Sequence, residues 1–165
     1  MIIGILVVLG AILLDQSSKY LMQYLLDSSQ TKVVIPHILE FKYFENSGAA
    51  WGSFEGQYGL FFVITIVVLV ILGYLFTKID FKTKKVYTLA ITFLIGGTIG
   101  NALDRVILGY VIDFLHIPFF DYLLFGHNFV FNFADIFLTF GVVLFAIDIL
   151  FLEGRRKAVE NETDR

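Results

Sequence analysis

The sequence predicts an all-α polytopic membrane protein with four transmembrane helices, and two observations carry this prediction. Of its 165 residues 58% are hydrophobic and only 16% are charged, whereas soluble chains average about 45–50% apolar and about 25% charged residues. The apolar residues also gather in segments close to the roughly 20 residues that cross a hydrocarbon core. The length suits one domain, so we expect a single membrane domain over 1–152 and a charged cytoplasmic tail over 153–165.

The expected spans lie at about residues 2–26, 58–77, 86–103 and 129–152. The second and fourth are the clearest, because polar residues interrupt the first and third. The first opens on an apolar run, residues 2–14, that could be mistaken for a signal peptide. It lacks a basic leading region, and the charged residues Asp15 and Lys19 follow where a small-residue cleavage site would stand. We therefore expect this segment to be a retained span.

The distribution of Lys and Arg predicts the orientation. The connection 78–85 carries four Lys, and the tail opens with three basic residues at 155–157. Of the longer connections, 27–57 holds only two Lys and 104–128 holds only one Arg. By the positive-inside rule, the short connection and both termini are expected in the cytoplasm, with the two long connections outside.

Both outer connections are expected to contain ordered structure. Residues 39–44 alternate between apolar and charged side chains with a period of two, which indicates a strand with one half-buried face. Pro36 and the turn residues 46–48 bound this strand. Residues 115–125 are too apolar for a solvated loop and too interrupted for a span, so we expect them to lie in the membrane interface.

Acidic residues in these apolar surroundings are the candidate catalytic groups. An ionisable group at membrane depth costs from about 2.5 to more than about 10 kcal/mol, which makes Asp104, Asp113 and Asp135 functional candidates. Asp135 is expected about six residues inside the fourth span, and Asp113 at similar depth in the outer connection. Two adjacent carboxyl groups share one proton, which leaves one as a base and the other as an acid. The alternative is that each Asp only caps a helix at the interface.

Other polar residues are expected near these acids. Asn101 and Asp104 share a helix face, and Arg105 offers a planar donor fork for a carboxylate, a phosphate or a carbonyl group. Asn132 precedes Asp135 by three residues, so both side chains are expected to point the same way. The alternatives are an Asp104–Arg105 interfacial anchor without chemistry and, at Asn132, a polar contact between helices.

Three further features are expected to be structural. Asp15 and Lys19 have the i, i+4 spacing of a helical ion pair that would orient the first helix. Asp148, near the inner end of the fourth span, is also expected to be structural. The glycines of 96–100 would allow close helix packing.

Several other chemistries are disfavoured. There is no Cys, and His37, His116 and His127 lack the spacing of metal ligands. We therefore expect neither a metal ion nor another cofactor. No Ser has a convincing base on the same helix face, which disfavours a serine mechanism. The net charge of −3 is small and dispersed, so nucleic acid is not an expected partner.

Five motifs occur in order along the chain. They are Asp15-Gln16-x-x-Lys19, Asn46-x-Gly48-Ala49-Ala50-Trp51-Gly52, Gly97-x-x-Gly100-Asn101-x-x-Asp104-Arg105, Val111-Ile112-Asp113-Phe114 and Phe131-Asn132-x-Ala134-Asp135. Together they resemble the motifs of the bacterial lipoprotein signal peptidases (signal peptidase II), from residue 15 to residue 135. Trp51 stands where Phe is common in that family, and the connection 115–128 is rather long.

The resemblance implies an aspartic endopeptidase of the bacterial cytoplasmic membrane, with Asp113 and Asp135 as the catalytic pair near the extracytoplasmic face. Its implied substrate is a diacylglyceryl-modified prolipoprotein, cleaved just before the lipidated lipobox Cys. The implied fold adds a β-cradle over 33–55 and an interfacial helix over 114–127 to the four helices. The remaining site positions, which bind substrate or support the site, are Asn46, Gly48, Asn101, Asp104, Arg105, Asn132, Asp15 and Lys19. Prolipoprotein and membrane lipid are the expected partners of a monomer.

Two other classes of function compete with an enzyme. A small transporter or proton conductor would distribute its acids through the bilayer, whereas these acids cluster in the outer half. A non-enzymatic scaffold would give no reason for Asn and Asp to recur together at three sites. Presenilin-like proteases share the paired acids, but their Gly-x-Gly-Asp signature is absent from this sequence.

Overall fold

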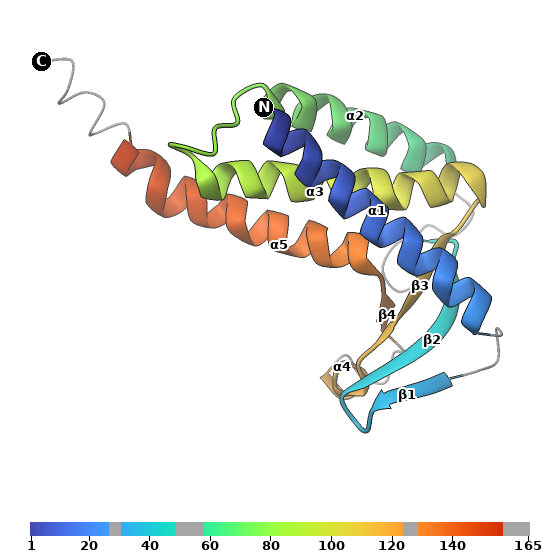
Figure 1. Ribbon diagram of the computed structural model, residues 1–165. Helices are drawn as coiled ribbons and strands as arrows, with labels where there is room; N and C mark the ends of the chain where they lie inside the picture. Colours follow the sequence, from blue (N-terminus) through green and yellow to red (C-terminus); the bar gives the residue numbers. More distant parts are fainter. Residues whose placement is uncertain (27–30, 49–57, 124–128, 157–165) are drawn as a thin grey trace, which may run out of the picture.

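In the computed structural model, which describes residues 1–26, 31–48, 58–123 and 129–156, a bundle of long helices has a small sheet at one end (Figure 1). The long helices are α1 (Ile2–Leu25), α2 (Tyr58–Phe76), α3 (Lys85–Ile107) and α5 (Phe133–Ile147), the last continuing through the π-helix η2 (Asp148–Leu152). Within the described ranges, four helices are long and apolar enough to cross a membrane. The predicted polytopic fold is confirmed.

The span boundaries differ from the prediction mainly at the sheet end of the bundle. The first two helices match the predicted limits closely, while α3 continues four residues beyond 103 to Ile107. The fourth long helix, α5, begins at Phe133 rather than 129, because residues 130–131 pair in the sheet before the helix starts. At its other end, residues 153–156 continue the helix and are not yet tail. The tail residues 157–165 lie outside the described part of the chain.

Glycines on α3 allow three helices to pack closely. This helix contacts α1, α2 and α5. A Cβ atom on Gly97 would lie 2.5 Å from the carbonyl oxygen of Ala134, and one on Gly100 would lie 2.6 Å from Oδ2 of Asp15. Only glycine fits such close approaches, as the small-residue run predicted. The approach brings polar groups of α1, α3 and α5 within hydrogen-bonding reach.

The sheet is antiparallel, with strand order β1-β2-β3-β4. Its strands are β1 (Thr31–Ile35), β2 (Leu39–Asn46), β3 (Val111–His116) and β4 (Val130–Phe131). The strand predicted at 39–44 is confirmed as part of β2, and the predicted cradle therefore exists. Its last part, 49–55, lies outside the described residues. Asp113 faces Phe44 across the β2–β3 pair, so it stands on a strand and not in a loop as expected.

A short helix, α4 (Pro118–Leu123), follows β3 and leaves Phe119 and Leu123 exposed. The predicted interfacial segment 114–127 therefore starts as a strand and becomes a helix only at 118; residues 124–127 are not described. The side chains of Met22, Leu26, Phe114 and Leu115 form an apolar core between the end of α1 and the sheet.

The two ends of the bundle differ in what they carry. The sheet lies at one end, while the start of α1, the connection between α2 and α3, and the end of the fourth helix lie at the other (Figure 1). This arrangement agrees with an even number of crossings.

Candidate active site

Asp135 and Asn132 form the start of α5. Asn132 is the N-cap residue, and its Oδ1 accepts a 2.9 Å hydrogen bond from the backbone N–H of Asp135. In return, Oδ2 of Asp135 accepts from the N–H of Asn132 at 3.2 Å, which completes a capping box. Asp135 thus lies in the first helical turn rather than six residues inside the span. Asn132 lies just before the helix, and not on the same helix face as Asp135 as expected. Asp135 therefore takes part in capping the helix, which is the alternative that the sequence left open, but both residues have further partners.

Asn132 also links the start of α5 to Asp113. Its Nδ2 donates to Oδ1 of Asp113 at 2.7 Å, while Nδ2 of Asn46, at the end of β2, donates to Oδ2 at 2.9 Å. Asp113 is only 2% exposed and Asp135 is partly exposed. The structure therefore brings two of the predicted asparagines and both predicted acids into one cluster.

The environment of Asp113 favours a proton. Burial of the carboxyl group raises its pKa from 3.8 to about 7, and the negative charge of the nearby Asp135 adds to the effect. Hydrogen bonds from Asn46 and Asn132 act in the opposite direction, because they stabilise the ionised form. A carboxyl group with this pKa can exchange its proton near neutral pH.

A buried ionic cluster lies beneath these acids. Nζ of Lys19 lies 2.8 Å from Oδ2 of Asp15, which confirms the predicted helical ion pair, and 3.0 Å from Oδ2 of Asp104 on α3. All three residues are at most 3% exposed. Oδ1 of Asp15 accepts a 2.8 Å hydrogen bond from the backbone N–H of Ala134. The cluster therefore ties α1 to α3 and to the first turn of α5, beyond the local role expected for the pair.

Asn101 connects this cluster to Asp135. Its Oδ1 accepts from Nζ of Lys19 at 2.9 Å and from Nδ2 of Asn132 at 3.0 Å. Its Nδ2 donates to Oδ1 of Asp135 at 2.8 Å. Asn101 thus belongs to the cluster, as the sequence predicted.

Gln16 is a site residue that was not singled out in the sequence. Its Nε2 donates to Oδ1 of Asp104 at 2.8 Å and to the carbonyl oxygen of Gly100 at 3.1 Å. The only signal for it was its position beside Asp15 in the first motif.

Arg105 and Asp104 have different neighbours, which does not fit the alternative of an Asp104–Arg105 pair. Asp104 accepts from Lys19, Gln16 and the backbone N–H of Ile112. The Arg105 guanidinium makes long hydrogen bonds to the carbonyl oxygens of Asn101 at 3.4 Å and of Gly48 at 3.5 Å. Gly48 is thereby placed beside the site, whereas residues 49–52 of its motif lie outside the described residues.

A groove of about 560 Å³ lies between α2 and α3, with Arg105 among its lining residues. Its walls are mostly apolar and include Phe61, Phe62, Ile66 and Leu69. The guanidinium carbon of Arg105 lies 4.9 Å from the centre of the Phe61 ring. The groove is therefore an apolar channel that has the cationic group of Arg105, close to the acids, in its wall.

His116 forms a separate polar cluster in the sheet. It is buried between Glu40, whose Oε2 lies 3.0 Å from Nδ1, and Asp121, whose Oδ2 lies 2.8 Å from Nε2. This contact joins α4 to the sheet, and the sequence did not reveal it. In the part of the chain that is described, no group of three or more acidic or His side chains could hold a metal ion. His127 is not described.

Asp148 lies at the opposite end of the bundle, where its carboxylate makes two hydrogen bonds to Arg156, at 2.7 and 2.6 Å. This agrees with the expected structural role. Asp113 and Asp135, in contrast, meet at the sheet end with the asparagines. A four-span bundle that gathers buried acids and amides beside a sheet defines a membrane protein with a functional site at that end.

Comparison with known proteins identifies the class more closely. The chain matches the family model for signal peptidase (SPase) II over residues 7–151. It is 38% identical over 158 residues to the lipoprotein signal peptidase of Staphylococcus aureus strain MRSA252, and 37% identical to that of strain JH9. Each alignment covers 95% of this chain and 93% of the relative. The protein therefore belongs to the signal peptidase II family, as the five motifs predicted.

Solved structures agree with this assignment. A bacterial membrane enzyme determined by the in meso method at 2.3 Å resolution is 36% identical, with a TM-score of 0.81 over 91% of this chain and 88% of its own. A second, at 1.9 Å resolution, is 37% identical, with a TM-score of 0.79 over 92% of this chain and 95% of its own.

Proposed function

We propose that this protein is an aspartic endopeptidase that removes signal peptides from diacylglyceryl-modified prolipoproteins, cutting just before the lipidated lipobox Cys. Membership of the signal peptidase II family supports the reaction and the substrate class. The observation that carries the chemistry is the pairing of Asp113 and Asp135. Each carboxylate accepts a hydrogen bond from an asparagine side chain, and these amides are themselves linked, through Asn101 and Asn132.

In the proposed mechanism the two carboxyl groups hold one proton between them. The ionised carboxylate takes a proton from water, which then attacks the scissile carbonyl carbon. The protonated partner donates its proton to the carbonyl oxygen. As the C–N bond breaks, the first carboxyl group passes the proton taken from water to the departing amine nitrogen, and the partner regains a proton from the hydroxyl group of the intermediate. The pKa of Asp113, about 7, keeps such a proton available near neutral pH. The asparagine donors hold both carboxylates in fixed orientations throughout.

The groove between α2 and α3 suits the apolar part of this substrate. Its aromatic and aliphatic walls offer contacts to an acyl chain, and Arg105 stands where the polar backbone of the precursor would follow. We infer that the guanidinium binds a carbonyl group of the precursor. A Lys in that position would offer only a point charge.

The proposed orientation places the acids near the extracytoplasmic face and both termini in the cytoplasm. The sheet and the start of α5, which carry the two acids, lie at one end of the bundle, and the connection 78–85 with its four Lys lies at the other (Figure 1). Since both acids come from one chain, a monomer is sufficient for the reaction.

The test is processing of a lipidated precursor by Asp113→Asn and Asp135→Asn proteins in membranes. Each substitution keeps the side-chain shape but removes an acid–base group, so we expect processing to fall by at least about 100-fold. Asp80→Asn, in the connection at the opposite end, is the matched control and should process normally. The gel shift of the precursor measures cleavage. If the Asp113 or the Asp135 variant cleaves at the normal rate, that residue is not part of the mechanism. EDTA is expected to leave the activity unchanged.

A further inference from the structure

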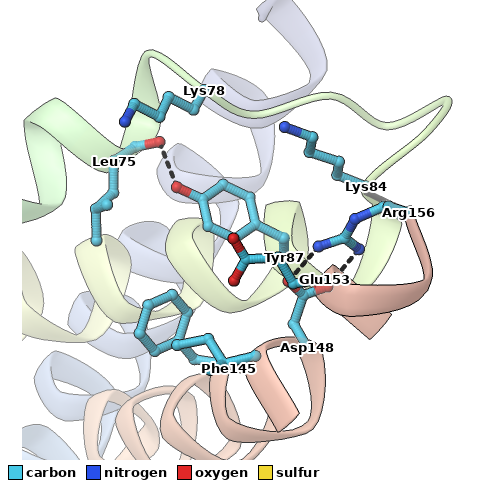
Figure 2. A pocket seen from close by; sticks show the side chains of 9 residues that line it. Leu75, Lys78, Lys84, Tyr87, Phe145, Asp148, Glu153 and Arg156 are labelled. Carbon is cyan, nitrogen blue, oxygen red and sulfur yellow. Dashed lines mark hydrogen bonds and ion pairs between the residues drawn. The ribbon is translucent and has the colours of Figure 1, made fainter. Parts of the chain in front are cut away.

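A second polar cavity lies at the end of the bundle away from the proposed active site. Its volume is about 280 Å³, and it is lined from the end of α2, the following connection, the start of α3 and the end of the fourth helix (Figure 2). Tyr87 lies in its middle, and Lys78, Lys84 and Arg156 surround it (Figure 2). The volume is near the lower limit of about 300 Å³ for ligand pockets, so it suits a small headgroup.

The fourth long helix is distorted where it borders this cavity. The helix changes to π-helical geometry at η2, where the N–H of Glu153 bonds the carbonyl oxygen of Asp148. Such bulges are frequent at functional sites. Asp148 is 1% exposed, and its carboxylate holds Arg156 through both terminal nitrogens of the guanidinium. A guanidinium has five N–H donors, so three remain for another acceptor.

The charges around the cavity favour a singly charged anion. Lys78, Lys84 and Arg156 contribute three positive charges, while Asp148 and Glu153 contribute two negative charges. The difference, three minus two, is one positive charge. A phosphodiester carries one negative charge and matches this balance, whereas a free phosphate group carries about 1.5 to 2.

The neighbouring helix surfaces indicate where such an anion comes from. Ile71 and Tyr74 on α2, and Ile149 and Leu150 on η2, are exposed apolar side chains. They would contact acyl chains while the headgroup enters the cavity. Basic pockets between transmembrane helices bind anionic lipid headgroups in this way. We propose that this cavity binds the phosphodiester headgroup of an anionic phospholipid.

The experiment uses the full-length protein purified in detergent and titrated with phosphatidylglycerol, with occupancy read by native mass spectrometry. Each basic residue near a membrane surface contributes about 1 kcal/mol to binding an anionic lipid. We therefore expect about fivefold weaker binding in Lys84→Gln and in Lys78→Gln. Glu153→Gln removes an opposing charge and should bind about fivefold more tightly. Lys82→Gln, in the same connection but not lining the cavity, should bind like the unaltered protein.

Two further titrations separate the possible ligands. Phosphatidylcholine has the same phosphodiester but no net charge, so it should bind more weakly than phosphatidylglycerol. Inorganic phosphate should not displace the lipid at equal concentration. Equal weakening in Lys82→Gln and Lys84→Gln would overturn the site, because only general surface charge would then be at work. Full displacement by inorganic phosphate would overturn the assignment to a lipid.

Discussion

Lys19 determines which way the side-chain amide of Asn101 faces. An ammonium group can only donate hydrogen bonds, so the atom of Asn101 that lies 2.9 Å from Nζ must be the carbonyl oxygen. The amide nitrogen is thereby turned toward Oδ1 of Asp135, at 2.8 Å. A residue on α1 thus controls a donor to a proposed catalytic carboxylate without being hydrogen-bonded to it.

The same reasoning applies to Asn132. The backbone N–H of Asp135 can only donate, so it requires Oδ1 of Asn132 to face it, at 2.9 Å. The nitrogen of Asn132 must then point to Asp113, at 2.7 Å. Both amide orientations follow from unambiguous donors, which makes the hydrogen-bond pattern around the two acids well defined.

Replacement of Lys19 by Met should strongly destabilise the protein. It would leave the carboxylates of Asp15 and Asp104 buried without their cation, and removal of one partner from a buried ion pair costs about 3–5 kcal/mol. Unfolding in detergent, followed by temperature or denaturant, measures the loss. Lys85→Met, at an exposed position on α3, should change stability by less than about 0.5 kcal/mol. A similarly small effect at Lys19 would show that the cluster contributes little to folding.

Activity should decline as the pH rises through about 7. The proposed working form of the acids holds one proton, and burial together with the charge of Asp135 raises the pKa of Asp113 to about 7. The stability of the fold should also decrease as the pH rises. The pKa of Asp113 is higher in the folded state, so its protonation favours folding at low pH, and this contribution is lost between pH 3.8 and about pH 7. The dependence of kcat/KM on pH measures this upper pH limit of activity.

Asn46→Ala should move that upper limit to higher pH. The Asn46 amide donates to Oδ2 of Asp113 and stabilises its ionised form, so its removal should raise the pKa further. Glu45→Gln, on an exposed neighbour in β2, should leave the limit where it is. A shift to lower pH in the Asn46 variant would contradict the assignment of this limit to Asp113.

Arg105→Lys should impair cleavage although the charge is retained. The planar guanidinium can bridge two acceptors at once, and it already reaches the carbonyl oxygens of Asn101 and Gly48. One lost charge-assisted bond of about 1.5–3 kcal/mol corresponds to a roughly 10- to 150-fold drop in kcat/KM on a lipidated precursor. Arg155→Lys, on the exposed end of the fourth helix, is the control. A change of less than about twofold at Arg105 would indicate only an interfacial anchor.

The orientation can be tested with inserted reporters. A reporter placed after Lys82 should be cytoplasmic, and one near position 122 should be extracytoplasmic, because four Lys in 78–85 compare with one Arg in 104–128. Accessibility to a membrane-impermeant label in intact cells measures the side. The opposite labelling would place the two acids on the cytoplasmic face and exclude the proposed reaction with exported precursors.

Local patterns were sufficient for the features that depend on neighbouring residues. The helices follow from continuous hydrophobicity, and β2 follows from alternation with a period of two. The Asp15–Lys19 ion pair follows from the i, i+4 geometry of any helix. The motifs also indicated the two acids and the asparagines, because their order along the chain is shared with a known family.

Tertiary packing decided everything that joins distant segments. The N–H of Ala134 bonds Asp15 across 119 positions of the chain, and Lys19 reaches Asn101 across 82. Helix α5 starts at 133 and not at the predicted 129, because residues 130–131 gain hydrogen bonds in the sheet. Hydrophobicity over a window of residues reports the depth at which a segment is stable. It carries no information on which polar groups of different helices meet, since that depends on side-chain directions and on close approaches such as the one at Gly100.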